Sequence, residues 1–147
     1  TLARRQEREL RTWLYGETQT AAMFKAALAQ AGAAVEDERG VPVEVVCVGD
    51  TELNADLEAM IKAARESVLN AAKHSGASAI DVYAEVADDR VEIFVRDRGK
   101  GFDPDLIADD RMGVKRSIID RMERHGGTAT IRSAPGEGTE VRLEMKR

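Results

Sequence analysis

The sequence predicts an α+β fold, a two-layer sandwich in which a mixed, mostly antiparallel sheet packs on helices, preceded by an N-terminal helix. Residues 80–86 with 91–95, and residues 128–133 with 139–145, alternate apolar and polar side chains around short turns, which is the pattern of two β-hairpins. Between these pairs, apolar residues recur at helical spacing. Strands grouped in hairpins, with helices between them, favour this class over a doubly wound parallel sheet.

Two helices and a connection are predicted before the first strand. Residues 2–15 are expected to be helical because Leu10 and Leu14 lie four positions apart, with arginines and glutamates on the other face. The Ala-rich residues 20–30 predict a second helix. Residues 35–40 (VEDERG) are mostly charged, and we expect them to form a connection.

A strand and a long helix come next. The short β-branched run at 43–48 (VEVVCV) predicts a strand. We expect Asp50 or Thr51 to cap the following helix, which continues to about Lys73. Its apolar stripe consists of Leu53, Leu57, Met60, Ile61, Ala64, Val68 and Leu69.

A polar, Gly-rich loop and a last helix separate the two hairpins. The loop is predicted over residues 96–111, and the helix over residues 113–125. One side of this helix carries the apolar residues Val114, Ile118, Ile119 and Met122. Gly126 and Gly127 are expected to end it, and residues 134–138 (APGEG) join the two strands of the final hairpin.

Composition narrows the function classes. The 147 residues suit one domain, or one domain with a short appendage, and the net charge of −5 gives no global attraction to nucleic acid or to an anionic membrane. One cysteine excludes an internal disulfide, and only two histidines, His74 and His125, argue against a histidine-rich metal site. Since no targeting or membrane-crossing segment is visible, we expect a cytoplasmic chain.

The end of the long helix carries the first group of candidate functional residues. Glu66 and Asn70 are four positions apart and Lys73 follows three later, so the three share one helical face. A carboxylate, an amide and an ammonium together suit a hydrated cation and phosphate oxygens. The alternative interpretation is a solvated helix face with an ordinary Glu–Lys pairing.

Glycine-rich segments form the second and third groups. Residues 97–102 (DRGKGF) directly follow a strand, where an aspartate can accept a hydrogen bond from an exocyclic amine. Gly113 is predicted to begin a helix, whose free N–H groups can bind phosphate, and residues 136–139 (GEGT) precede the last strand. A turn, a helix start and a tight hairpin are the alternative interpretations. Neither the dinucleotide fingerprint nor the P-loop pattern is matched.

Taken in this order, the segments resemble the histidine-kinase-type ATP-binding domain, whose Bergerat-type fold is shared with DNA gyrase, the heat-shock 90 chaperones and the mismatch-repair clamp. Residues 66–74 (ESVLNAAKH) are similar to its N box, and residues 97–101 (DRGKG) to its first glycine box. Residues 111–114 (RMGV) are similar to its second glycine box, and residues 136–141 (GEGTEV) to its closing G-x-G-T segment. The N-box and last-helix sequences resemble the NarX and DesK-like branch of sensor histidine kinases.

The resemblance implies roles for the N-box residues, with ATP and Mg²⁺ as cofactors. Asn70 would hold Mg²⁺ through its amide oxygen, and Glu66 would position a water on the metal or act as a base. Lys73 would neutralise phosphate charge. His74 would place its ring against the adenine. The implied catalytic residues are therefore Glu66, Asn70 and Lys73.

The resemblance also implies nucleotide contacts in the glycine boxes. Asp97 would accept a hydrogen bond from the adenine amine, supported by Thr139. Gly99 and Gly101 would let the backbone approach the nucleotide, and residues 102–112 would form a lid over the triphosphate. The nucleotide-binding set is completed by Arg111, Gly113 and Val114.

One position departs from the family pattern. The second glycine box usually begins with glycine, but this chain has Arg111 there. Two interpretations stay open: Arg111 is a phosphate ligand carried by the lid, or the box is weakened and ATP binds poorly.

The resemblance further implies a domain division and partners. Residues 1–34 would be a helical remnant of the dimerisation and phosphoacceptor region with a linker, and residues 35–147 the catalytic domain. The whole protein would be a homodimer that donates the γ-phosphoryl of ATP to a histidine on its dimerisation domain, and then to a response regulator. It would contact a membrane only through an upstream sensor region. Neither His74 nor His125 fits the phosphoacceptor position.

Two other functions stay open at this level. The chain could be a degenerate interaction module of the same fold, with weak or no turnover, for which Arg111 is the best support. It could also be a stand-alone serine kinase of the anti-sigma type, which the details of the N-terminal helix disfavour.

Overall fold

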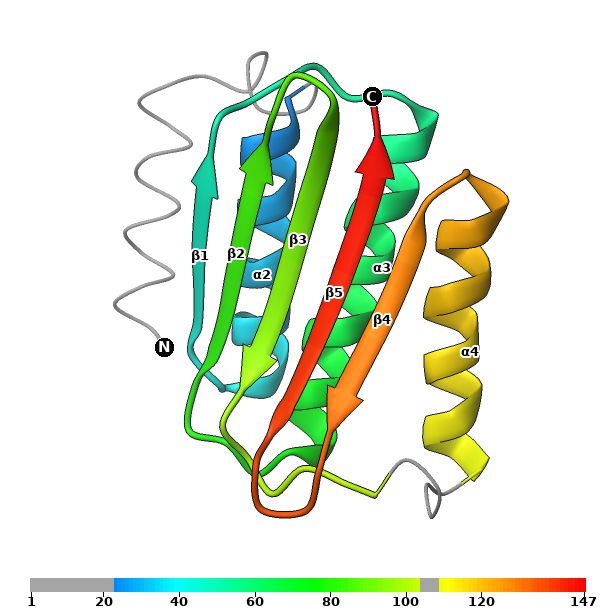
Figure 1. Cartoon of the computed structure of the whole chain (residues 1–147). Helices are drawn as coiled ribbons and strands as arrows, with labels where there is room; N and C mark the ends of the chain where they lie inside the picture. The colour runs from blue at the N-terminus through cyan, green and yellow to red at the C-terminus, as the bar shows by residue number, and fades with distance from the viewer. Residues whose placement is uncertain (1–22, 104–108) are drawn as a thin grey trace.

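The computed structural model describes residues 23–103 and 109–147 (Figure 1). The predicted N-terminal helix at 2–15 and the start of the one at 20–30 lie outside the described residues. The described elements follow in the order α2 (Phe24–Arg39), β1 (Val43–Val48), α3 (Ala55–His74), β2 (Ile80–Val86), β3 (Arg90–Asp97), α4 (Asp109–Arg124), β4 (Thr128–Ser133) and β5 (Thr139–Lys146). None of the described helices is both long enough and apolar enough to cross a membrane.

The strands form one mixed sheet in the order β1-β2-β3-β5-β4. Strand β1 runs parallel to β2, and the other neighbours are antiparallel. Both predicted hairpins, β2–β3 and β4–β5, and the predicted strand at 43–48 are confirmed. Helices α2 and α3 lie behind this sheet in Figure 1, and α4 lies against β4. The predicted two-layer α+β sandwich is therefore confirmed.

The core lies between the sheet and the helices because each strand alternates its side chains between two faces. The inward residues of β3, Val91, Ile93 and Val95, are at most 2% exposed. Met60 and Val68 of α3 meet this layer and are equally buried. The period of two in the strands and the helical stripe in α3 thus produce one apolar interior.

The outer face of the sheet carries many charged side chains, together with the exposed apolar residues Val46, Val48 and Tyr83, and it holds one nearly buried carboxylate. Glu92 of β3 is 9% exposed and lies within 2.8 Å of Arg90 and of Arg142 on β5. Burial raises the pKa of this carboxyl, but hydrogen bonds and charge from Arg142 and Arg90 outweigh burial and hold the pKa below its usual range.

Helix α2 is longer than predicted. Residues 35–39, expected to be a connection, are helical, and Gly40 ends the helix with a φ of 73°. The prediction was wrong because Val35 and Glu36 face the interior, while the charges beyond them face solvent. The carboxylate of Glu36 accepts a hydrogen bond from the Val43 N–H at 2.8 Å. The helix thus runs without a break across the expected domain boundary at residues 34 and 35.

The cap of α3 is not the one predicted. Asn54, rather than Asp50 or Thr51, accepts a hydrogen bond from the Leu57 N–H at 2.8 Å. Asp50 instead accepts from the N–H of Lys25, at the start of α2, at 2.9 Å. The side chain therefore caps a helix 25 residues earlier in the chain, a contact that local spacing does not indicate.

Helix α4 begins at Asp109, four residues before its predicted start at Gly113. Glycine is unfavourable inside helices, which is why the sequence favoured a boundary there. Gly113 is exposed, and a Cβ at this position would meet no atom within 4 Å, so the helix passes through it. Gly113 therefore does not provide a free helix N-terminus, and residues 104–108 of the predicted lid lie outside the described part of the chain.

Candidate functional site

A pocket opens between the C-terminal half of α3, the last residues of β3 and the first residues of β5. Its wall is contributed by α3, the inner face of these two strands and the loop that follows β3. The lining residues are Ser67, Asn70, Ala71, His74, Ser75, Val95, Asp97, Gly101, Phe102, Thr139 and Val141. Five predicted site residues, Asn70, His74, Asp97, Gly101 and Thr139, therefore come together although they are far apart in the sequence.

Asp97 is the most buried charged residue of the pocket wall. It ends β3, is 5% exposed, and pairs across the sheet with Thr139. Burial raises the pKa of its carboxyl, and hydrogen bonds from the backbone N–H groups of Gly99 and Thr139 partly offset this. A buried carboxylate with remaining acceptor capacity suits a ligand that offers an N–H donor.

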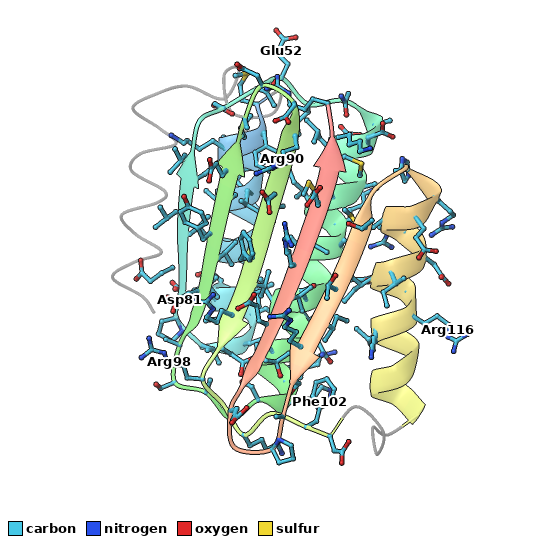
Figure 2. All side chains as sticks on the ribbon, in the orientation of Figure 1. Glu52, Asp81, Arg90, Arg98, Phe102 and Arg116 are labelled. Carbon is cyan, nitrogen blue, oxygen red and sulfur yellow. The ribbon has the colours of Figure 1, made fainter. Side chains whose placement is uncertain are left out.

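The sequence analysis did not identify Ser133, whose hydrogen bonds connect three residues at the rim of this pocket. Its hydroxyl donates to the Gly138 carbonyl at 3.0 Å and accepts from the Phe102 N–H at 2.9 Å. It also lies 2.9 Å from the hydroxyl of Thr139, its register partner on β5. The position of this serine opposite Thr139 in the predicted β4–β5 hairpin is the sequence signal that could have identified it. Figure 2 shows Phe102 on the side of the loop that faces β4 and α4.

The loop after β3 is fixed by backbone contacts on both sides. The Lys100 N–H donates to the Ser75 carbonyl at 2.8 Å, and the Lys100 carbonyl accepts from Gly136. Gly101 has a φ of +62°, and a Cβ there would clash with the Ala134 carbonyl oxygen. Glycine is thus required at 101 to bring the loop against the β4–β5 turn. This requirement for glycine comes from the packing of the protein itself and does not depend on a ligand.

Asn70 carries the clearest sign of a missing partner. Its Oδ1 atom is buried and has no hydrogen-bond partner among the described residues. Amide oxygens of this kind are ligands for Mg²⁺, which commonly takes few protein ligands together with water and phosphate oxygens. The chemistry of the Asn70 Oδ1 atom therefore fits a magnesium ion.

Glu66 lies one helical turn before Asn70 but does not line the pocket. Its Oε1 is 3.2 Å from Nη1 of Arg121, and its Oε2 accepts from the Ser117 hydroxyl at 3.3 Å. Both partners belong to α4. The sequence indicated the face that Glu66 shares with Asn70, but not these contacts to another helix.

The remaining predicted residues lie around the pocket rather than in its wall. Lys73 is exposed near the end of α3, and Gly99 packs against Ser75. Gly113 and Val114 lie in α4, whose first turns are near the C-terminal end of α3 in Figure 1. Arg111 also falls within α4, but its side chain is outside the described part of the structure. The structure thus gathers Asn70, His74, Asp97, Gly101 and Thr139 in the pocket wall, whereas Lys73, Gly99, Gly113 and Val114 are not among the lining residues.

Comparisons with known proteins bear on the family and the fold of the chain. The family model described as Histidine kinase-, DNA gyrase B-, and HSP90-like ATPase matches residues 55–147. The chain is 34% identical over 115 residues to the signal transduction histidine-protein kinase/phosphatase DegS of Bacillus subtilis, which covers 71% of this chain and 29% of DegS. The chain therefore spans less than a third of the length of that relative.

Solved structures share the fold. The histidine kinase domain of the blue-light activated histidine kinase from Erythrobacter litoralis EL346 superposes with a TM-score of 0.68 at 15% identity, over 91% of this chain and 67% of that one. The ATP binding domain of PrrB from Mycobacterium tuberculosis gives a TM-score of 0.67 at 20% identity, over 83% of this chain and 92% of that one. At these identities the likeness concerns the architecture alone.

Proposed function

Because the chain belongs to the family of histidine kinase-, DNA gyrase B- and HSP90-like ATPases, we propose that it binds Mg-ATP and donates the γ-phosphoryl group to a histidine of a dimerisation domain in two-component signalling. The observation that carries the proposal is the pocket in which the buried carboxylate of Asp97 occurs together with the Asn70 amide oxygen, which has no partner among the described residues.

The pocket wall suits an adenine base. Val95, Ala71 and Val141 offer apolar contact to a flat ring, and Asp97 at the end of β3 accepts a hydrogen bond from its exocyclic amine. His74, half-buried at the end of α3, adds an aromatic face. Ser133 holds Thr139 and the Phe102 backbone in place beside the base.

Phosphate would lie beyond Asn70, toward the start of α4. Asn70 would hold a magnesium ion through Oδ1, and Glu66 would act on that ion through water. Bound magnesium supplies charge neutralisation for the phosphate oxygens. Lys73, exposed at the rim, adds a positive charge, and Arg111 would add a second one. Gly113 and Val114 lie inside helix α4, so their backbone N–H groups are not free for the phosphates. In the transfer, the bond between the β–γ bridging oxygen and the γ-phosphorus breaks, and a nitrogen–phosphorus bond to the acceptor histidine forms.

The acceptor and the partners belong to the whole protein. We propose that residues 1–34 continue from the dimerisation and phosphoacceptor region and that the full-length protein is a homodimer. This chain would be its cytoplasmic part, connected to a membrane only through an upstream sensor region. Its phosphoryl group passes to an aspartate of a response regulator. Transfer is tested in the full-length protein with γ-labelled ATP, which should give an acid-labile label on histidine. A label on serine would contradict the proposal and favour the anti-sigma type of kinase.

Nucleotide binding is tested by calorimetry with ATP and Mg²⁺ on the Asp97→Asn variant. The amide presents an N–H group where the carboxylate accepts, so we expect ATP affinity to fall about 10- to 100-fold, the cost of a charge-assisted hydrogen bond. The matched control is Asp81→Asn, the same substitution at an exposed site on the outer face of neighbouring β2 (Figure 2). ATP binding that is equal in wild type and Asp97→Asn would sink the assignment.

A further inference from the structure

We propose that Arg121 is a positioning residue that competes with Mg²⁺ for the Glu66 carboxylate, so that helix α4 sets how much magnesium the chain needs to bind its nucleotide. The inference rests on the proposed function, since it concerns the same metal. The observation behind it is that both carboxylate oxygens of Glu66 are engaged by α4.

The contacts of Glu66 are formed by one face of α4. Arg121 and Ser117 are four positions apart, so their side chains project from the same side of the helix. The guanidinium approaches Oε1 at 3.2 Å, and the hydroxyl donates to Oε2 at 3.3 Å. The Arg121 and Glu66 side chains are 25% and 34% exposed, so water only partly screens their attraction.

Glu66 is also placed to serve the metal. It lies four residues before Asn70 on the same face of α3, and Asn70 Oδ1 is the buried oxygen without a described partner. A hydrated magnesium ion at Asn70 would draw on the Glu66 carboxylate through its water shell. The Arg121 guanidinium and the magnesium ion would then both interact with the Glu66 carboxylate. By linkage, each interaction weakens the other.

The position of α4 is fixed by a second contact between the same helices. Nδ1 of His125, just after α4, lies 2.8 Å from Oδ1 of Asp56, near the start of α3. The two contacts show that the helices run antiparallel, with the first turn of α4 toward the Asn70 end of α3 (Figure 1). Arg121 is therefore held opposite Glu66 by the packing of the whole helix pair.

The test measures ATP binding by calorimetry over a series of free Mg²⁺ concentrations, and once in EDTA. In Arg121→Gln the magnesium concentration for half-maximal enhancement of ATP binding should fall about two- to fivefold, the range of a partly exposed ion pair. Affinity in EDTA should stay within about twofold. In a Glu66→Gln background, Arg121→Gln should not lower this magnesium concentration any further. A merely structural role of Arg121 would not give that outcome.

Controls separate the possible failures. Arg116→Gln removes the same charge from an exposed site of α4 that points away from α3 (Figure 2), and should leave the magnesium dependence unchanged. If Arg121→Gln does not fold, Arg121→Lys, which keeps the charge without the planar fork, should give a smaller fall. An unchanged or higher magnesium requirement overturns this inference alone. A wild-type chain that binds no ATP in either buffer overturns the proposed function as well.

Discussion

Gly101 shows how a single residue shapes the pocket. It follows the Asp97-x-Gly99 turn and has a φ of +62°, with the Ala134 carbonyl oxygen in the space that a Cβ would occupy. The Phe102 N–H beside it reaches Ser133, which in turn holds Thr139. The glycine thus lets one loop contact the β4–β5 turn and line the pocket at once.

Gly101→Ala should lower the free energy of unfolding more than Gly76→Ala. Both positions have positive φ, which costs a residue with a Cβ about 1–2 kcal/mol, but only Gly101 adds a clash, whose relief costs a further ~1–3 kcal/mol. A Cβ at Gly76 would meet nothing within 4 Å, which makes this position the matched control. Urea unfolding without nucleotide measures both, and equal losses would show that the close approach at 101 is not rigid.

Asp50 illustrates the element scale, because it joins the turn after β1 to helix α2, 25 residues earlier in the chain. Helix α2 begins without a side-chain cap of its own, since its N-cap position is Met23. The carboxylate of Asp50 accepts from the Lys25 N–H, and the Phe24 N–H donates to the Thr51 carbonyl at 2.9 Å. The turn after β1 therefore caps α2 and fixes it against the sheet.

Asp50→Ala should destabilise the fold by about 1 kcal/mol, the usual cost of a lost helix cap. Asp50→Asn keeps the side-chain oxygen that accepts from Lys25 and should lose much less. The midpoint of urea unfolding, with a constant slope, checks both. A loss in Asp50→Asn as large as in Asp50→Ala would mean that the carboxylate acts by its charge and not as a hydrogen-bond acceptor.

At the scale of the whole molecule, two buried carboxylates shift stability with pH in opposite directions. Asp97 has a raised pKa in the fold, so its contribution is fully present below the ordinary Asp range and is lost as pH rises through the folded pKa. Glu92 has a lowered pKa, so its contribution is present above the ordinary Glu range and is lost as pH falls through the folded pKa. Asp97 lines the pocket, whereas Glu92 lies on the outer face of the sheet.

Thermodynamic unfolding across pH should separate the two groups. Relative to wild type, Asp97→Asn should gain stability as pH rises from about 4 toward neutral, because the buried charge is gone. Glu92→Gln should gain relative to wild type as pH falls below about 4, where wild type loses its ion pairs. A parallel pH profile for wild type and Asp97→Asn would contradict the raised pKa.

Much of the fold follows from local pattern. Alternation in 80–86, 91–95, 128–133 and 139–145 predicted both hairpins, and the helical stripe predicted most of α3, because pleat and helix periods depend only on neighbours in the chain. The motif positions Asn70, His74, Asp97, Gly101 and Thr139 were identified differently, from the resemblance of short segments to those of a known family, and they meet in one pocket.

The amino-acid sequence by itself determined the two-layer α+β class, the strands and the residue types that the pocket needs. Only the tertiary structure decided that Asp50 caps α2, that residues 35–39 continue a helix, that Ser133 holds Thr139, and that Glu66 is bound by Arg121. The physical reason is that each of these is set by a contact with a distant segment or by which face is buried. The periodicity of apolar residues indicates which side of a helix or strand is apolar, whereas tertiary packing determines which segment contacts that side.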